Sequence, residues 1–171
     1  ADGMEHEIED DLMFPLVTGK DAKRYEAPSS RKFVIFPYDL SKSKPALLST
    51  AVMEKQFPRG MSYLRGFEAK LRARESGSFD DNEWYRFGRN QGLGKQSIPK
   101  LGVATTVPNM RVFFDPKGEY VFLGARAEGV IPHSEVNGWY LLGILNSPVV
   151  NFVFKRTAKC IEVDKYEANK Q

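Results

Sequence analysis

The sequence has 171 residues, of which 42% are hydrophobic and 27% are charged. These totals exclude a wholly disordered chain and fit one soluble globular domain. With one cysteine, Cys160, and two histidines, we expect no intrachain disulfide, no zinc cluster and no other metal site. No apolar run reaches the about 18 residues of a membrane span, so we expect no membrane contact. Because the sequence begins at Ala1 and not at methionine, we expect a piece of a longer protein.

The formal net charge of +3 is unevenly distributed along the chain. Residues 1–12 hold six acids and no Lys or Arg, whereas residues 13–171 carry a net charge of about +9. We expect residues 1–8 to form an acidic disordered segment, residues 9–160 the main domain, and residues 161–171 a polar tail. A basic domain favours an anionic partner, and nucleic acid is the commonest such partner.

Helices dominate the elements predicted in the first half of the chain. Acids at the start of Glu9–Val17 favour a short helix, because they suit the positive end of a helix dipole. The β-branched and aromatic run Lys32–Phe36 predicts a strand. A second helix is predicted to begin at Ser43-Lys44-Pro45 and to run to about Gln56. A third helix is predicted over Met61–Glu75, with apolar residues on one face.

Strands come next, and apolar helices end the chain. Three strands are predicted: Leu101–Val107, Arg111–Phe114 and Tyr120–Leu123. Asp115-Pro116-Lys117-Gly118 predicts a hairpin turn between the last two strands. An apolar helix is predicted over Trp139–Leu145, and Asn146-Ser147-Pro148 leads into a further segment, Val149–Lys155. The order predicts an α+β fold, with a mixed β-sheet core, short helices early and apolar helices near the C-terminus.

A glycine-rich basic loop lies in the middle of the sequence. Residues 84–111 contain no acid and five bases: Arg86, Arg89, Lys95, Lys100 and Arg111. Arginine can bond guanine with two hydrogen bonds, and asparagine or glutamine can do the same with adenine. Arg89, Asn90 and Gln91 therefore make this loop a candidate for reading base edges.

Motifs for catalysis are missing from the sequence. Gly92-Leu93-Gly94-Lys95 fails as a phosphate-binding loop, because Gln96 stands where a hydroxyl should hold magnesium. No proline is followed by aspartate, as one class of nucleases requires, and no Gly-x-Ser-x-Gly elbow is present. The polar-Pro-Pro-aromatic motif of amino-methyltransferases is missing too. We therefore expect no catalytic residue and no cofactor in this chain.

Several segments occur in an order that matches a known family: Leu16–Tyr25, Lys32–Tyr38, Phe57-Pro58, Tyr63-Leu64, Leu71–Arg74, Trp84–Arg89, Phe114–Tyr120 and Tyr140–Pro148. With this set, residues 9–156 resemble the TaqI-like specificity domain. That domain is the target-recognition domain C-terminal to the methyltransferase domain in type II restriction–modification enzymes that methylate adenine. The chain is more distantly similar to the specificity subunits of type I systems.

The resemblance implies a DNA-binding role in the cytoplasm of a bacterium or archaeon. The parent enzyme would flip an adenine out of double-stranded DNA and methylate it from S-adenosylmethionine. It could also be an endonuclease. This chain would clamp the duplex against the catalytic methyltransferase domain of the same parent and read the bases around the adenine. The residues expected to contact DNA are Lys20, Lys23, Arg24, Arg86, Arg89, Asn90, Gln91, Lys95, Lys100 and Arg111.

Two other functions remain open at this point. The chain could be half of a type I specificity subunit, although it lacks the heptad run of the long helices that join two recognition domains. It could also be a protein-interaction domain with a basic face. At the level of residues, the loop could be a solvated surface, and Lys20, Lys23 and Arg24 could cap a helix end.

Overall fold

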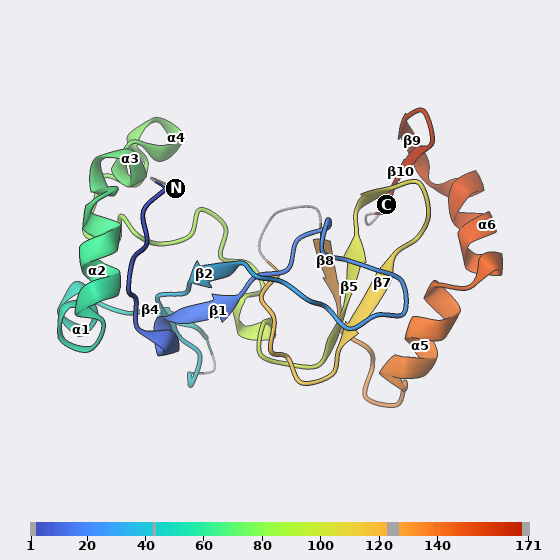
Figure 1. The fold of residues 1–171 in the computed structure, drawn as a ribbon, viewed down its shortest axis with the longest axis horizontal. Coiled ribbons are helices and arrows are strands. Elements are labelled where there is room, and N and C mark those ends of the chain that lie inside the picture. The colour runs from blue at the N-terminus through green and yellow to red at the C-terminus, as the bar shows by residue number, and fades with distance from the viewer. Residues whose placement is uncertain (1–2, 43, 123–126, 169–171) are drawn as a thin grey trace. The chain divides into compact units, whose positions relative to one another are not determined.

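Residues 3–42, 44–122 and 127–168 are described by a computed structural model of the chain (Figure 1). The chain folds into two compact units, and each unit is made of two separate stretches of sequence. Unit 1 comprises Ala1–Phe14 and Val34–Gly94, and unit 2 comprises Pro15–Phe33 and Lys95–Gln171. Helices and antiparallel sheets are segregated along the chain, so the fold is α+β, as the sequence predicts.

Unit 1 is mainly helical. Its elements are η1 (Asp10–Leu12), β3 (Tyr38–Asp39), β4 (Ala46–Leu47), α1 (Thr50–Gln56), α2 (Pro58–Arg65), α3 (Glu68–Arg72) and α4 (Arg74–Gly77). The unit boundary falls within the paired strands β1 (Met13–Pro15) and β2 (Phe33–Ile35), and again within η2 (Leu93–Lys95). The side chain of Ser49 accepts a hydrogen bond from the Val52 N–H, which is why α1 begins there.

The core of unit 1 joins η1 to the helices. Its buried side chains are Leu12, Met53, Met61, Trp84 and Tyr85. A Cβ atom at Gly60 would lie 2.3 Å from Cδ2 of Leu12. A side chain at this position would force Leu12 to move, so glycine suits the close packing of α2 on η1.

The described residues of unit 2 form two small sheets and two helices. Its elements are β5 (Lys100–Ala104), β6 (Thr106–Val107), β7 (Val112–Asp115), β8 (Ala127–Val130), α5 (Gly138–Leu145), α6 (Pro148–Thr157), β9 (Lys159–Glu162) and β10 (Lys165–Glu167). In one sheet β5 lies between β7 and β8, and in the other β10 lies between β6 and β9. All four of these pairings are antiparallel. Helix α5 packs against β7 and β5.

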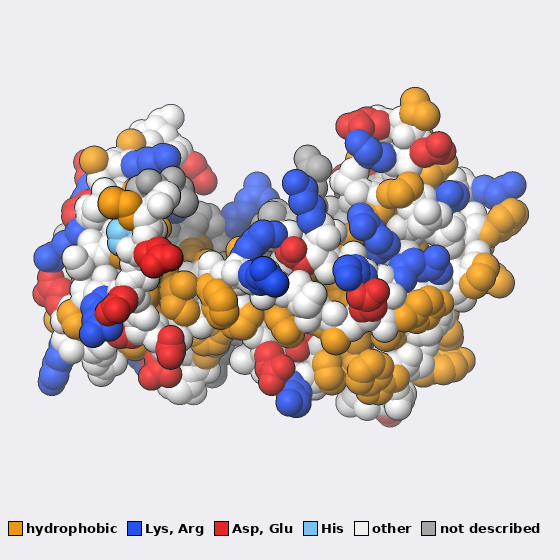
Figure 2. Space-filling view, in the orientation of Figure 1, with side chains coloured by type: hydrophobic (Ala, Val, Ile, Leu, Met, Phe, Trp, Pro, Cys, Tyr) orange, Lys and Arg blue, Asp and Glu red, His pale blue; other side chains and the backbone are white. Residues whose placement is uncertain are grey.

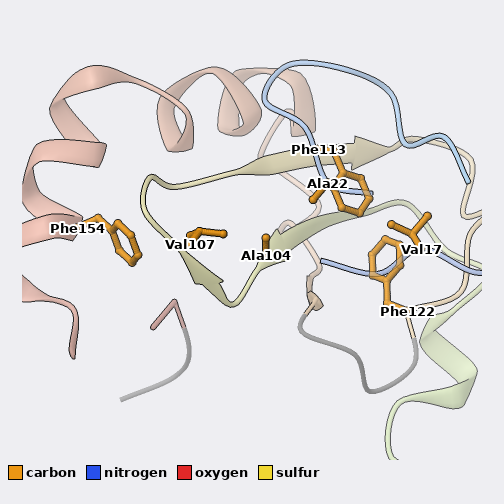
Figure 3. Close-up of a cluster of buried hydrophobic side chains, with 7 residues drawn as sticks. All are labelled: Val17, Ala22, Ala104, Val107, Phe113, Phe122 and Phe154. Atoms are coloured by element: carbon orange, nitrogen blue, oxygen red, sulfur yellow. The ribbon is translucent and has the colours of Figure 1, made fainter. Parts of the chain in front are cut away.

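The core of unit 2 includes side chains from its early stretch, Pro15–Phe33. Val17 and Ala22 from that stretch join a buried cluster with Ala104, Val107, Phe113, Phe122 and Phe154 (Figure 3). The backbone of Val121 holds the same stretch, because its N–H donates to the Pro15 carbonyl at 2.8 Å and its carbonyl accepts from the Val17 N–H at 3.0 Å. Residues far apart in sequence are thus fixed against each other within unit 2.

The helix predicted over Glu9–Val17 is wrong. The structure has η1 followed by β1, and β1 pairs with β2. The acids at Asp10 and Asp11 do begin a helical turn. However, the apolar residues after them gain more from pairing with a distant strand than from continuing a helix.

The strands and helices from Lys32 to Glu75 are predicted in kind but less well in their bounds. The strand at Lys32–Phe36 is confirmed as β2. The helix predicted from Ser43 begins only at Thr50, after β4, and ends at Gln56 as expected. The helix predicted over Met61–Glu75 is divided into α2, α3 and α4, and it begins earlier, because Pro58 occupies the first turn of α2.

The predictions for the later elements are partly confirmed and partly wrong. The predicted strands at 101–107 and 111–114 correspond to β5, β6 and β7, and the apolar helix is α5. The predicted hairpin between β7 and Tyr120–Leu123 is wrong among the described residues, where Val121 makes only an isolated parallel bridge to Leu16. Leu123 itself lies outside the described residues. Strands β8, β9 and β10 are not predicted, and β9 spans the boundary expected at residue 160.

The early acidic segment lies against α2 where it is described. The His6 ring packs on the Tyr63 ring with centroids 4.8 Å apart, and Glu7 pairs with Arg59 at 3.1 Å. The Glu9 carboxylate accepts hydrogen bonds from the Arg59 and Gly60 N–H groups, each at 2.9 Å. Glu9 therefore caps the N-terminus of α2 from a distant part of the chain.

Replacing Glu9 with alanine should lower the free energy of unfolding by about 1 kcal/mol, because two backbone donors lose their acceptor. Burial acts to raise the pKa of Glu9, but the hydrogen bonds from Arg59 and Gly60 outweigh it and hold the pKa below its ordinary value. The stabilisation is thus complete above the ordinary carboxyl pKa and is lost as the pH falls through the lowered one. Urea unfolding at neutral and acid pH measures both effects. Glu7→Ala is the control, and an equal loss in both variants would refute the cap.

Candidate nucleic-acid interface

Positive charge is concentrated in unit 2. This unit has 15 Lys and Arg against 9 Asp and Glu, whereas unit 1 has 10 against 13. Unit 2 therefore carries a net charge of +6 and unit 1 a net charge of −3. An anionic polymer would gain most of its electrostatic attraction from unit 2.

The segment at residues 88–92, which we call the recognition loop, belongs to unit 1 and is anchored at both ends, by half-buried Phe87 before it and by buried Leu93 after it. Before it, the Phe87 ring packs on Tyr38 with centroids 5.1 Å apart, and the Phe87 N–H donates to the Tyr38 hydroxyl at 2.8 Å. Burial raises the pKa of Tyr38. After the loop, Leu93 is buried in unit 1. Gly92 has a φ of +77°, which turns the chain back toward that anchor.

The tip of the recognition loop presents Arg89, Asn90 and Gln91, which are all exposed. Among the described residues, none of these three side chains has a hydrogen-bond or ion-pair partner. Their donors and acceptors are therefore available to an external ligand, and the anchored ends limit the conformational freedom that binding must remove.

Arginines fix the segment that leads into the recognition loop. Arg86 pairs with Asp81 at 2.6 Å and donates to the Ser78 carbonyl at 3.0 Å. Arg74 donates to the Trp84 and Arg86 carbonyls at 2.7 and 2.9 Å. The Phe79 ring contacts both guanidinium groups, at 4.0 Å from Arg74 and 4.5 Å from Arg86. Arg86 thus supports the fold, as does Arg74, which no sequence signal marks.

Within unit 2, the basic segment, residues 18–32, is organised by Asp21. Its carboxylate accepts hydrogen bonds from the Thr18 N–H at 2.8 Å and the Thr18 hydroxyl at 2.7 Å, and it pairs with Lys32 at 3.2 Å. Burial acts to raise the pKa of Asp21, but these partners outweigh it and the pKa lies below its ordinary value. The resulting turn exposes Lys20.

Cations at the surface of the basic segment differ in their pairing. Lys20 and Arg31 are exposed and have no partner in the part of the chain that the structure describes. Lys23 is exposed and pairs with Glu26 at 3.0 Å, an interaction that solvent weakens. Arg31 was not among the residues predicted to contact DNA.

Arg24 is held by the C-terminus of α5. Its guanidinium and the Tyr25 hydroxyl both donate to the carbonyl of Asn146. The Asn146 side chain in turn bonds both the N–H and the carbonyl of Val112, at 3.0 and 2.8 Å. The capping role considered for Arg24 is therefore real, but the helix is α5 and not one near residue 17. Arg111 is half-buried, and among the described residues its Nε has no partner.

Lys100 is buried and its ammonium group is fully engaged. It pairs with Asp115 at 2.8 Å, donates to the Gln96 carbonyl, and lies 4.6 Å from the centre of the Phe122 ring. Burial lowers the pKa of Lys100, although Asp115 opposes this effect. Lys100 cannot reach a phosphate without leaving these partners, so we omit it from the proposed interface. Lys95 remains exposed.

Comparison with known proteins points to one class of enzyme. No family model matches the chain. The chain is 28% identical over 134 residues to the type II restriction enzyme and methyltransferase RM.Eco57I of Escherichia coli. The chain is related to a restriction–modification enzyme. The match covers 68% of this chain but only 13% of RM.Eco57I, so the chain spans a small part of that relative. The relation to restriction–modification is thus confirmed, while the TaqI-like assignment stays a prediction.

Within the described ranges, no group of three or more His, Cys, Asp or Glu side chains could hold a metal ion. None of the described helices is long and apolar enough to cross a membrane.

Replacing Lys100 with methionine should lower the free energy of unfolding by about 3–5 kcal/mol, because Asp115 would remain buried without its charged partner. Thermal unfolding measures this loss. Lys95→Met removes the same charge from the surface and should change stability by less than about 0.5 kcal/mol. If both variants were equally stable, the Lys100 side chain would not be buried as described and would again be a candidate for phosphate contact.

Proposed function

We propose that this chain is the target-recognition part of a restriction–modification enzyme that methylates adenine in double-stranded DNA. The observation that carries the proposal is the recognition loop, where three side chains suited to base edges are exposed between two anchored ends, without partners among the described residues. Its similarity to RM.Eco57I supports a role in the same kind of system.

The recognition of base edges, which determines the DNA sequence that is bound, is assigned to the recognition loop. The planar guanidinium of Arg89 can donate to both major-groove acceptors of one guanine. The amides of Asn90 and Gln91 can pair with adenine by one donor and one acceptor. Because these groups have no partner among the described residues, binding breaks none of the hydrogen bonds seen there.

The phosphate contacts that hold the duplex are assigned to exposed cations of unit 2, chiefly Lys20, Arg31 and Lys95. Contacts with phosphates fix the position of a protein on DNA but carry no sequence information. Lys23 can join them if it leaves Glu26, a step that costs little at an exposed site.

Methyl transfer and S-adenosylmethionine binding are assigned to a catalytic domain outside this chain. Flipping an adenine costs a few kcal/mol, so the duplex must be held while its base leaves the stack. A recognition part that binds phosphates and base edges would supply that hold from the side opposite the catalytic domain.

Substitutions in the loop and in the basic segment should affect different properties of the enzyme. In the full-length enzyme, Arg89→Ala or Gln91→Ala should weaken discrimination at one base position by about 1–3 kcal/mol. Arg89→Lys should do the same although it keeps the charge, because lysine lacks the planar fork. Lys20→Ala should weaken methylation of all sequences alike. Methylation of a library with randomised sites measures both effects.

The matched control is Lys55→Ala, which removes an exposed lysine from α1, outside the proposed contacts. It should leave both site preference and overall rate unchanged. An intact site preference in Arg89→Ala, together with an altered one in Lys20→Ala, would reverse the assigned roles. No change in any variant would mean that the loop is a solvated surface and that the proposal is wrong.

A further inference from the structure

The outer face of α5 and α6, which we call the apolar face, carries large exposed hydrophobic side chains. Six of them are between 39% and 72% exposed: Trp139, Tyr140, Ile144, Val149, Phe152 and Val153. Figure 2 shows hydrophobic side chains gathered over these helices. Each helix repeats its exposed residues at a spacing that keeps them on one side.

Both sides of these two helices are apolar. Leu142 of α5 and Phe154 of α6 are buried on the inner side, while residues 138–154 contain no charged residue at all. A helix at the surface of a globular protein normally carries polar and charged residues on its outer side. A helix that is apolar all round is usually buried, so the composition indicates that the outer side is covered in the functional molecule.

The area of the apolar face is close to that of one side of a protein–protein interface. At the observed exposures, three aromatic and three aliphatic side chains present on the order of 600 Å² of apolar surface. This value reaches the upper end of the about 300–600 Å² of the largest patch on a typical monomer. It also approaches the about 800 Å² that each partner buries in a specific interface.

The apolar face is held rigidly before any partner arrives. The Trp139 ring packs edge-on against Phe114 with centroids 4.9 Å apart. The turn between the helices is fixed by the buried Asn146, and the Ser147 hydroxyl caps α6 by accepting from the Val150 N–H at 3.2 Å. A preorganised surface loses little entropy on binding.

We propose that the apolar face docks onto the catalytic part of the restriction–modification enzyme. This inference rests on the function proposed above, and it names the surface by which the chain is attached to its partner. The relative RM.Eco57I, in which the matched segment is 13% of the length, leaves most of an enzyme outside that segment. DNA is a poor occupant, because residues 138–154 offer a phosphate no cation.

Charge at one end of the apolar face indicates the chemistry of the partner surface. Lys155 and Arg156 follow the uncharged run, and the Arg156 guanidinium lies 3.8 Å from the centre of the Phe152 ring. The catalytic part should therefore present an apolar surface with a carboxylate opposite these two cations. A second copy of this chain would bring no acid on its α5 or α6 to meet them.

The test uses Val149→Glu in the full-length enzyme. Val149 lies in the first turn of α6, where a carboxylate suits the helix dipole, so the variant should fold. We expect limited proteolysis to release the recognition part at least tenfold faster than from the wild type, with methyl transfer reduced at least tenfold. Val163→Glu, at a 92% exposed position between β9 and β10, is the control and should leave both rates unchanged.

The isolated chain separates this inference from the proposed function. Val149→Glu in the isolated chain should bind duplex DNA as the wild type does, since the substitution lies outside the proposed DNA contacts. If the isolated chain binds no DNA, the proposed function fails, while faster proteolysis of the variant enzyme would still support docking. Unchanged proteolysis in the variant enzyme would overturn the docking proposal. It would also be overturned if the wild-type chain sedimented as a dimer that Val149→Glu dissociated, because the occupant would then be a second copy.

Discussion

A buried ion pair between Lys100 and Asp115 organises unit 2. Besides Lys100, the Asp115 carboxylate accepts hydrogen bonds from the Glu119 and Tyr120 N–H groups at 3.0 and 3.1 Å. These bonds fix the turn after β7 and thereby place the backbone of Val121 beside Pro15–Phe33, the stretch that begins the unit. The basic segment lies within that stretch, so the position of its exposed cations depends on two charges that are themselves buried. Burying a charge is costly unless it is paired, so neither partner can be lost without disturbing this arrangement.

The distribution of charge along the sequence differs from the distribution of exposed charge in the structure. Residues 84–111 contain no acid, and the sequence alone therefore suggests a uniformly basic surface. In the structure, Arg86 pairs with Asp81 and Lys100 with Asp115, and both acids lie outside that run. The run is also divided between the two units at residue 94. The DNA contacts proposed above are therefore limited to a short set of exposed side chains in unit 1 and a separate set of cations in unit 2.

Local signals predicted the fold where the structure depends on local interactions. The apolar run predicted α5, and Asn146-Ser147-Pro148 marked the break before the segment that forms α6, because a helix bonds within its own segment. The helix predicted at Glu9–Val17 failed because its apolar end pairs with a distant strand. The same distinction applies to the candidate site. The exposure of Arg89 follows from its polar, glycine-flanked loop, whereas the hydrogen bond from Arg24 to the end of α5 depends on a residue 122 positions away.

The dependence of DNA binding on salt tests the central claim most directly. Fluorescence anisotropy of a labelled duplex should show that the isolated chain binds more weakly as salt rises from about 50 to about 200 mM, because phosphate contacts release counterions. Lys20→Ala and Arg31→Ala should each reduce the slope of log affinity against log salt by about one unit. Lys55→Ala should leave the slope unchanged. Binding that does not change with salt, or no binding at any salt, would contradict the assignment of this chain as a DNA-recognition part.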